Sequence, residues 1–148
     1  MKIYVDADAL PAPLREVLLK VAERTKVETW FAAGRYPRLP ESDYVRCVAA
    51  GSDFNGADDW IVKHVATGDL VITADIPLAD RCLDGGAAVL GLRGDFFTHD
   101  NIKNALAMRG LLEELRTTGE ATGGPAPFSS KQREKFINAL NRFLQKKR

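Results

Sequence analysis

The chain has few of the residues that build disulfide frameworks or zinc sites. It contains two cysteines and two histidines in 148 residues. Cys47 and Cys82 lack the spacing of a metal site, so we expect them to be thiols in a reducing compartment, most simply small buried hydrophobic residues. His64 and His99 show no metal-ligand spacing to each other or to a cysteine, and a helix surface or a loop explains them. This scarcity argues against a zinc protein and against a disulfide-rich secreted scaffold.

Long apolar runs and nucleotide-binding loops are absent as well. No run approaches the roughly 20 apolar residues that span a membrane. Asp6 and Asp8 interrupt the apolar N-terminal segment, which argues against a signal peptide and for a cytoplasmic protein without a membrane partner. Neither GxxxxGK[ST] nor GxGxxG occurs, and no serine has a nucleophile-elbow context. The sequence gives no indication of oligomeric state.

Charge is plentiful but unevenly placed along the chain. Residues 1–100 hold 11 Lys and Arg against 16 Asp and Glu, a net charge of −5. Residues 101–148 hold 10 Lys and Arg against 4 Asp and Glu, a net charge of +6. An acidic region beside a basic tail suits a metal site that must also attract a polyanion. A solvated helix with a basic end is the alternative explanation.

Strand and helix patterns alternate through the first 90 residues. Helical periodicity begins near Pro11, near Asp58 and near Pro77, and a helical stretch runs from Ile102 to Leu115 before Gly119. A loop over 119–128 precedes a last, basic helix at about 129–146, with Ser129 as N-cap and Gln132 completing a capping box. Short apolar runs predict strands over 2–6, 27–33, 44–50, 70–73 and 87–90.

This alternation predicts an α/β fold with three layers, α/β/α, around a mostly parallel central sheet. A chain of 148 residues is the length of one domain, so we expect residues 1–148 to form a single domain.

Acidic residues follow two of the predicted strands. Asp6 and Asp8 come after the first strand, and Asp75 follows the strand 70–73. If these strands are parallel neighbours, the three carboxylates share the sheet edge where open α/β sheets bind ligands. Asp58 and Asp59 open a helix that could reach the same edge. Clustered carboxylates repel one another unless a cation lies among them, and oxygen ligands suit Mg²⁺ or Mn²⁺. The pattern predicts a divalent-metal site for phosphate chemistry.

Structural roles remain open for several of these acids. Asp8 is also a candidate cap for the helix that begins at Pro11. Asp58 and Asp59 lie in a first helical turn, where a carboxylate stabilises the helix dipole. One of the two is expected to cap while the other faces the site, with Asp58 slightly favoured as the ligand. Thr73 could bind a metal-bound water, although a buried strand threonine is the simpler interpretation.

Basic residues in two segments are candidates for contacts with phosphate. Arg35 and Arg38 share a loop with Tyr36, on whose ring a base could stack. The last helix contributes Lys131, Arg133 and Lys135. These side chains predict a nucleic-acid partner, with RNA favoured over DNA.

Several segments together resemble the YaiI/YqxD family of small bacterial proteins. They are VDADALPAP, GADDWIVKHV, GDLVITADIPLADRCL, an RG followed by FTHDNI, and TGGPAPFSSKQREKFINAL. The resemblance runs from Ile3 to Leu144. It implies a fold similar to PIN-like nuclease domains, which bind Mg²⁺ or Mn²⁺ through acids at strand ends and on an adjacent helix. By motif, Asp6, Asp58 and Asp75 resemble those acids, and Asp8 is an additional acid of this family.

Three functions are consistent with these patterns. The first is a metal-dependent nuclease, most plausibly on RNA, in which Asp6, Asp58 and Asp75 with Asp8 hold one or two cations. The second is a phosphatase of the haloacid-dehalogenase type, because Asp6-Ala7-Asp8 after a strand resembles the nucleophile motif of those enzymes. The third is a nucleic-acid-binding or regulatory protein without catalysis. Mg²⁺ or Mn²⁺ is the expected cofactor of the first.

Overall fold

A six-stranded sheet forms the centre of the computed structural model, which describes residues 1–35, 38–50, 56–104 and 129–146. The strand order is β3-β2-β1-β4-β5-β6, and only β6 is antiparallel to its neighbour. The strands are β1 (Ile3–Asp6), β2 (Thr29–Ala33), β3 (Val45–Ala49), β4 (Leu70–Ile72), β5 (Ala88–Leu90) and β6 (Phe96–Phe97). The mostly parallel central sheet predicted from the sequence is thereby confirmed.

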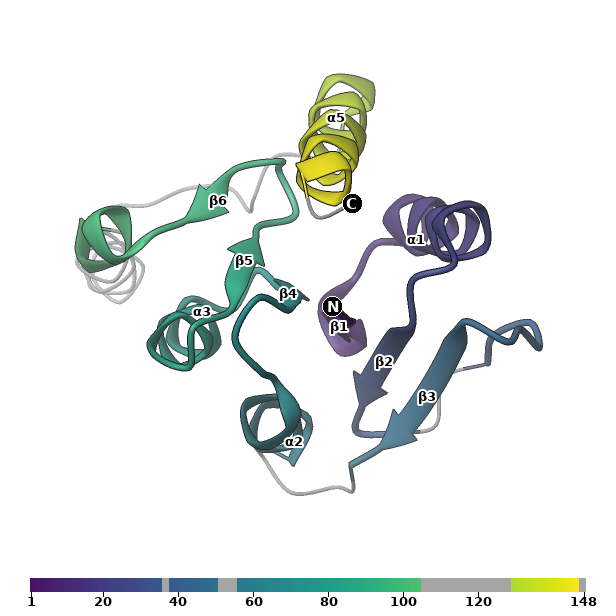
Figure 1. Ribbon diagram of the computed structural model, residues 1–148, viewed down its shortest axis with the longest axis horizontal. Helices are drawn as coiled ribbons and strands as arrows, with labels where there is room; N and C mark the ends of the chain where they lie inside the picture. The colour runs from purple at the N-terminus through teal and green to yellow at the C-terminus, as the bar shows by residue number, and fades with distance from the viewer. Residues whose placement is uncertain (36–37, 51–55, 105–128, 147–148) are drawn as a thin grey trace, which may run out of the picture.

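Helices cover both faces of this sheet (Figure 1). On one face lie α1 (Ala12–Thr25) and α5 (Ser130–Lys146), and on the other lie α2 (Gly56–His64) and α3 (Ile76–Asp84). Residues 99–104 are also helical. The three-layer α/β/α architecture expected from the alternating pattern is confirmed. Among the described residues, no helix is both long and apolar enough to cross a membrane.

The central strands are apolar on both faces because both faces are covered. Ile3 and Val5 of β1 pack with α1 and α5, whereas Tyr4 packs with α2 and α3. Val5 is fully buried, and Ile3 and Tyr4 are nearly so. A continuous apolar run is the pattern of a parallel strand buried on two sides, which explains why this short segment already predicted a central strand.

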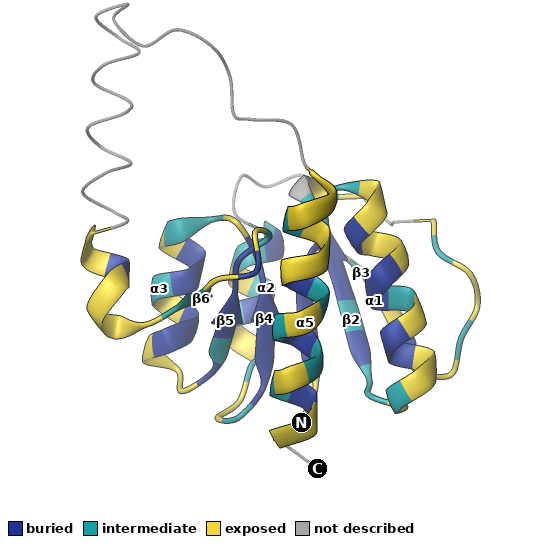
Figure 2. Ribbon diagram, turned by 90° about the horizontal axis from the view of Figure 1, so that it is seen from above, coloured by how far each residue is buried: buried dark blue, intermediate teal, exposed yellow. Residues whose placement is uncertain are grey.

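Helices α1 and α5 lie side by side and run in the same direction (Figure 2). Near their carboxyl ends the Arg24 guanidinium donates a hydrogen bond of 2.6 Å to Asn141 Oδ1. At the other end the predicted capping box is confirmed: Gln132 N donates to Ser129 Oγ and Ser129 N donates to Gln132 Oε1, both at 3.2 Å. Because α1 begins beyond the carboxyl end of β1 and α5 runs in the same direction as α1, the amino end of α5 lies at the carboxyl ends of the parallel strands.

Two features differ from the sequence expectation. β6 was not predicted, because two residues are too few for a recognisable period, and a 3-10 turn over Ala7–Ala9 separates β1 from α1. The expected helix from Ile102 to Leu115 is seen only through its beginning, within 99–104, and the rest lies outside the described residues. The expected loop over 119–128 also lies outside them.

Candidate functional site: an acidic edge of the sheet

The parallel strands β1 and β4 lie side by side in the middle of the sheet, and the chain adds its later strands in opposite directions from this point. From β1 the chain continues through α1 to β2 on one side, and from β4 through α3 to β5 on the other. Open α/β sheets bind ligands outside the carboxyl ends of the strands at such a switch point. Val5 pairs with Ile72 in the register, so the next residues, Asp6 and Thr73, meet at this edge.

Thr73 joins the two strand ends. Its hydroxyl donates a hydrogen bond of 2.9 Å to Asp6 Oδ2 and accepts one of 3.0 Å from Asp75 N. The Asp75 carboxylate in turn caps α3 by accepting a hydrogen bond of 3.0 Å from Leu78 N. Thr73 thus orients the Asp6 side chain and holds the Asp75 backbone, while Leu78 N orients the Asp75 carboxylate. Sequence reasoning favoured a plain buried threonine at this position and missed the bridge, although the spacing Thr73-Ala74-Asp75 at a strand end was a usable signal.

Asp6 is a buried carboxylate with an unfavourable environment for its charge. It is 8% exposed. Burial raises the pKa of Asp6, and the charges of Asp75 and Asp8 raise it further, while the hydrogen bond from Thr73 and one from the Asp8 amide oppose the shift. A buried carboxylate between two others is a position that favours either a proton or a cation.

Asp58 reaches the same group from α2. Burial raises the pKa of Asp58 to about 6, with further contributions from the charges of Asp75 and Asp6, while Arg81 lowers it. No hydrogen bond to the Asp58 carboxylate is found within the described residues. Asp6, Asp58 and Asp75 therefore form one electrostatic cluster, called here the acidic edge.

Asp8 and Asp59, the other two predicted acids, have different surroundings. Both oxygens of Asp8 accept from Gly34 N, at 3.0 and 3.3 Å, so Asp8 ties the turn after β1 to the loop after β2. It does not cap α1, whose N-cap is Pro11. Asp59 accepts a hydrogen bond of 2.9 Å from Arg81 Nη1 of α3, and both side chains are largely exposed. Of the pair on α2, Asp58 is the residue coupled to the strand-end acids.

The donor atoms of the acidic edge fit a hard cation, but they do not form a ready cage. Among the described residues, no three Asp, Glu, His or Cys side chains are placed so as to hold a metal ion. Asp6 is held by Thr73 and Asp75 by Leu78 N, and like charges favour separation of the carboxylates. All the donors are oxygens, the ligands that Mg²⁺ and Mn²⁺ prefer. A cation would also relieve the repulsion that raises the pKa of Asp58.

The predicted basic residues lie in two separate places. Arg35 and Arg38 are exposed in the loop after β2, and Arg35 follows Gly34, the partner of Asp8. Tyr36, the expected stacking ring, lies outside the described residues. Lys131, Arg133 and Lys135 are exposed on α5. Arg133 lines a depression together with Pro13 of α1. Lys135 Nζ instead donates a hydrogen bond of 2.6 Å to Asp95 Oδ1.

Cys82 and His64 have structural surroundings, whereas Cys47 of β3 is only partly buried. Cys82 is fully buried, and burial raises its pKa to about 12. The His64 ring stacks on Trp60 with centroids 4.2 Å apart, and its Nδ1 lies 2.8 Å from the Trp60 carbonyl oxygen. The expectation of a buried thiol is confirmed for Cys82 but not for Cys47, and His64 lies on a helix surface as expected.

Comparison with known proteins identifies the family of the chain. Residues 4–146 match the model of a family described as "Uncharacterized BCR, YaiI/YqxD family". The chain is 48% identical over 144 residues to a UPF0178 protein of Maridesulfovibrio salexigens, covering 97% of this chain and 95% of the relative. It is 49% identical over 145 residues to a UPF0178 protein of Solidesulfovibrio magneticus, covering 98% and 97%. No solved structure matches. The chain belongs to the YaiI/YqxD family.

Proposed function

We propose that the protein is a phosphodiester hydrolase that cleaves RNA with Mg²⁺ or Mn²⁺ as cofactor, and that the acidic edge is its catalytic centre. The observation that carries this proposal is the electrostatic coupling of Asp6, Asp58 and Asp75 at the switch point of the sheet. Three separate elements, β1, α2 and the β4–α3 connection, supply these acids. Raised pKa values in a ligand-binding position are typical of functional rather than structural carboxylates.

The protein contributes partly oriented oxygen ligands to this chemistry. Thr73 orients Asp6, and Leu78 N orients Asp75. Asp58 has no hydrogen-bond partner within the described residues and is free to adjust. Asp8 lies next to this group, fixed to Gly34. A bound Mg²⁺ or Mn²⁺ would lower the pKa of a water molecule and offset the charge of the phosphate. Hydrolysis adds that water across one P–O bond and leaves a phosphate monoester and a free hydroxyl.

RNA is the proposed substrate because basic side chains accompany the acidic edge. Arg35 is exposed in the loop to which Asp8 is tied, and α5 begins at the same end of the sheet. Positive side chains near an acidic centre attract the polyanion that the carboxylates alone would repel. The resemblance to PIN-like nuclease domains favours the same chemistry.

The other two functions are less well supported. A phosphatase of the haloacid-dehalogenase type needs Asp6 as an accessible nucleophile, whereas Asp6 is 8% exposed and bonded to Thr73. It also leaves the coupling of Asp58 to Asp6 without a role. A nucleic-acid-binding protein without catalysis uses the basic residues but gives the acidic edge no function.

The two neighbouring acids of α2 provide a matched test. We expect Asp58→Asn to lower Mn²⁺-dependent cleavage of a labelled single-stranded RNA by at least about 100-fold, because it removes a ligand of the cluster. Asp59→Asn removes the same charge one residue away, from an exposed pair with Arg81, and should change the rate by about twofold or less. Cleavage is measured by gel electrophoresis with and without EDTA.

Equal rates for wild type and Asp58→Asn, purified identically, would contradict the proposal. RNA binding without any metal-dependent cleavage would select the non-catalytic function instead. A covalent aspartyl-phosphate on Asp6 would select the phosphatase.

A further inference from the structure

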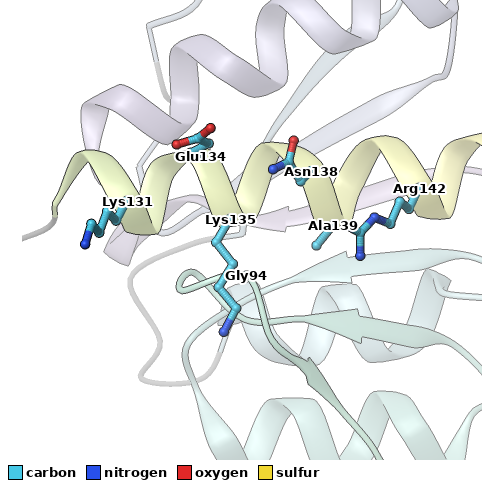
Figure 3. A pocket seen from close by; sticks show the side chains of 7 residues that line it. All are labelled: Gly94, Lys131, Glu134, Lys135, Asn138, Ala139 and Arg142. Atoms are coloured by element: carbon cyan, nitrogen blue, oxygen red, sulfur yellow. The ribbon is translucent and has the colours of Figure 1, made fainter.

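A groove about 410 Å³ in volume runs along α5 (Figure 3). It shares no lining residue with the depression that Arg133 lines beside α1. Gly94 lines it from the turn after β5, and α5 contributes Lys131, Glu134, Lys135, Asn138, Ala139 and Arg142. We call it the α5 groove. It is separate from the acidic edge, since none of Asp6, Asp58 and Asp75 lines it.

Gly94 brings the turn after β5 directly against the helix backbone. A Cβ atom built on Gly94 would lie 2.8 Å from Lys135 C and from Phe136 N, and the residue has a φ of +89°. Only glycine combines this approach with this conformation. At this side of the α5 groove the turn is therefore in close contact with the backbone of α5.

The positive side chains of α5 that line the groove are aligned. Figure 3 shows Lys131, Lys135 and Arg142 extending to one side of α5, toward the Gly94 turn, while Glu134 and Asn138 extend to the other. Lys135 pairs with Asp95. No carboxylate partner of Lys131 or Arg142 is found within the described part of the chain.

The spacing of these cations matches an extended polyanion better than a small anion. With a rise of about 1.5 Å per residue, Lys131 and Lys135 are about 6 Å apart along the helix and Arg142 lies about 10 Å further on. The whole helix carries five basic residues and one acidic residue, a net charge of +4. A compact anion cannot contact both Lys131 and Arg142, which are about 16 Å apart along the helix, whereas successive phosphates of a strand could contact all three cations.

We propose that the α5 groove binds the sugar-phosphate backbone of single-stranded RNA, through Lys131, Lys135 and Arg142. The bound strand is the substrate of the acidic edge, so this part rests on the proposed function. Because α5 begins at the carboxyl ends of the strands and runs away from them, a strand held at the acidic edge can continue along the helix. The groove would hold the RNA beyond the cleaved bond, without reading its sequence.

Binding without turnover tests this placement. Anisotropy of a fluorescein-labelled oligouridylate is measured in EDTA, where metal-dependent cleavage is absent, over a range of salt concentrations. Each phosphate contact with a single strand adds about 0.7 to the magnitude of the slope of log affinity against log salt concentration. With 1 M salt as the reference, the loss of one contact therefore lowers the logarithm of affinity at 0.1 M salt by about 0.7. The double variant Lys131→Gln/Arg142→Gln should bind about 25-fold more weakly at 0.1 M salt, with a salt slope smaller by about 1.4.

A matched control removes the same charge elsewhere. Lys20→Gln/Lys63→Gln removes two exposed lysines, on α1 and α2, and should weaken binding less than about threefold. Similar losses in the two double variants would mean that the interaction follows net charge alone, and the inference would be overturned. Unchanged binding in Lys131→Gln/Arg142→Gln would overturn it too, as would equally tight, equally groove-dependent binding of a duplex.

The readouts keep the two proposals apart. Groove-dependent binding without cleavage by the wild type would support the α5 groove and contradict the proposed nuclease activity. Cleavage that depends on Asp58, with RNA binding and KM unchanged in Lys131→Gln/Arg142→Gln, would support the nuclease and refute the groove.

Discussion

Two buried aspartates at opposite ends of the sheet have different environments. Asp69 precedes β4 at its amino end and is 6% exposed, while Asp6 ends β1 and is 8% exposed. Asp69 Oδ1 accepts from Lys2 N and Oδ2 from Ala66 N, both at 2.9 Å. Asp6 lies instead among other carboxylates, which help raise its pKa.

The comparison separates a structural acid from the acid that we propose to be functional, at similar burial. A carboxylate that accepts backbone amide bonds at both oxygens is stabilised as an anion by the fold itself. A carboxylate surrounded by other carboxylates is destabilised as an anion until a positive charge binds beside it. Burial alone does not distinguish the two cases, whereas the partners of each oxygen do.

Replacing the two aspartates should have opposite consequences, and this is the largest effect we expect on stability. Asp69→Ala leaves two backbone amides without their charged acceptor and should lower the free energy of unfolding by about 2–4 kcal/mol. Asp6→Asn should leave the unfolding free energy at pH 7.5 unchanged or higher, and abolish cleavage. Urea unfolding monitored by circular dichroism measures the first quantity. A greater loss of stability in Asp6→Asn than in Asp69→Ala would reverse the assignment.

A smaller effect on stability is expected at Gly94, where the turn after β5 contacts α5. In Gly94→Ala the new methyl group would meet the α5 backbone at 2.8 Å in a residue with positive φ, so we expect a loss of about 2 kcal/mol. Gly85→Ala is the control, because the φ of Gly85 is −79° and the new Cβ atom would lie 3.4 Å from Cys82 O, an ordinary contact distance. Thermal unfolding of the two variants compares them, and equal melting temperatures would argue against the tight contact.

The smallest expected effect is a gain of stability at the acidic edge. The pKa of Asp58 is about 6 in the folded protein against 3.8 for a free carboxyl group. Folding therefore favours the protonated form, and ionisation above pH 6 costs stability. Asp58→Asn removes that cost and should raise the unfolding free energy of the metal-free protein by about 1 kcal/mol at pH 7.5, allowing for solvent screening.

The same gain should disappear on acidification. It should shrink as the pH falls from about 6 toward 4, because Asp58 is then protonated in the wild type as well. Unfolding in EDTA at several pH values measures the difference. A variant less stable than wild type at pH 7.5 would show that the Asp58 charge is compensated in the fold.

Local patterns in the sequence were sufficient for the architecture and for the convergence of strand-end acids. Apolar runs marked β1 and β4, and parallel pairing of these strands brought Asp6 and Asp75 to one edge. The spacing of Ser129 and Gln132 was sufficient to predict the capping box, because both partners lie within one helical turn.

Contacts between distant segments could not be predicted in this way. The bond from Thr73 to Asp6 spans 67 positions, and the pair of Arg81 with Asp59 depends on how α2 and α3 pack. The role of Asp69 could not be predicted either, since its bond from Lys2 N forms only when β1 and β4 pair, although its bond from Ala66 N is local. The sequence supplied candidate acids, and tertiary contacts distinguish their surroundings.

Manganese binding measured by titration calorimetry tests the central claim most directly. At pH 7.5 we expect saturable binding to the wild type, weaker binding as the pH falls through 6 because protons compete for Asp58, and none in Asp6→Asn/Asp75→Asn. Asp59→Asn should bind as the wild type does. Absence of binding to the wild type at pH 7.5, or equal binding by the double variant, would contradict a cation site at the carboxyl ends of β1 and β4.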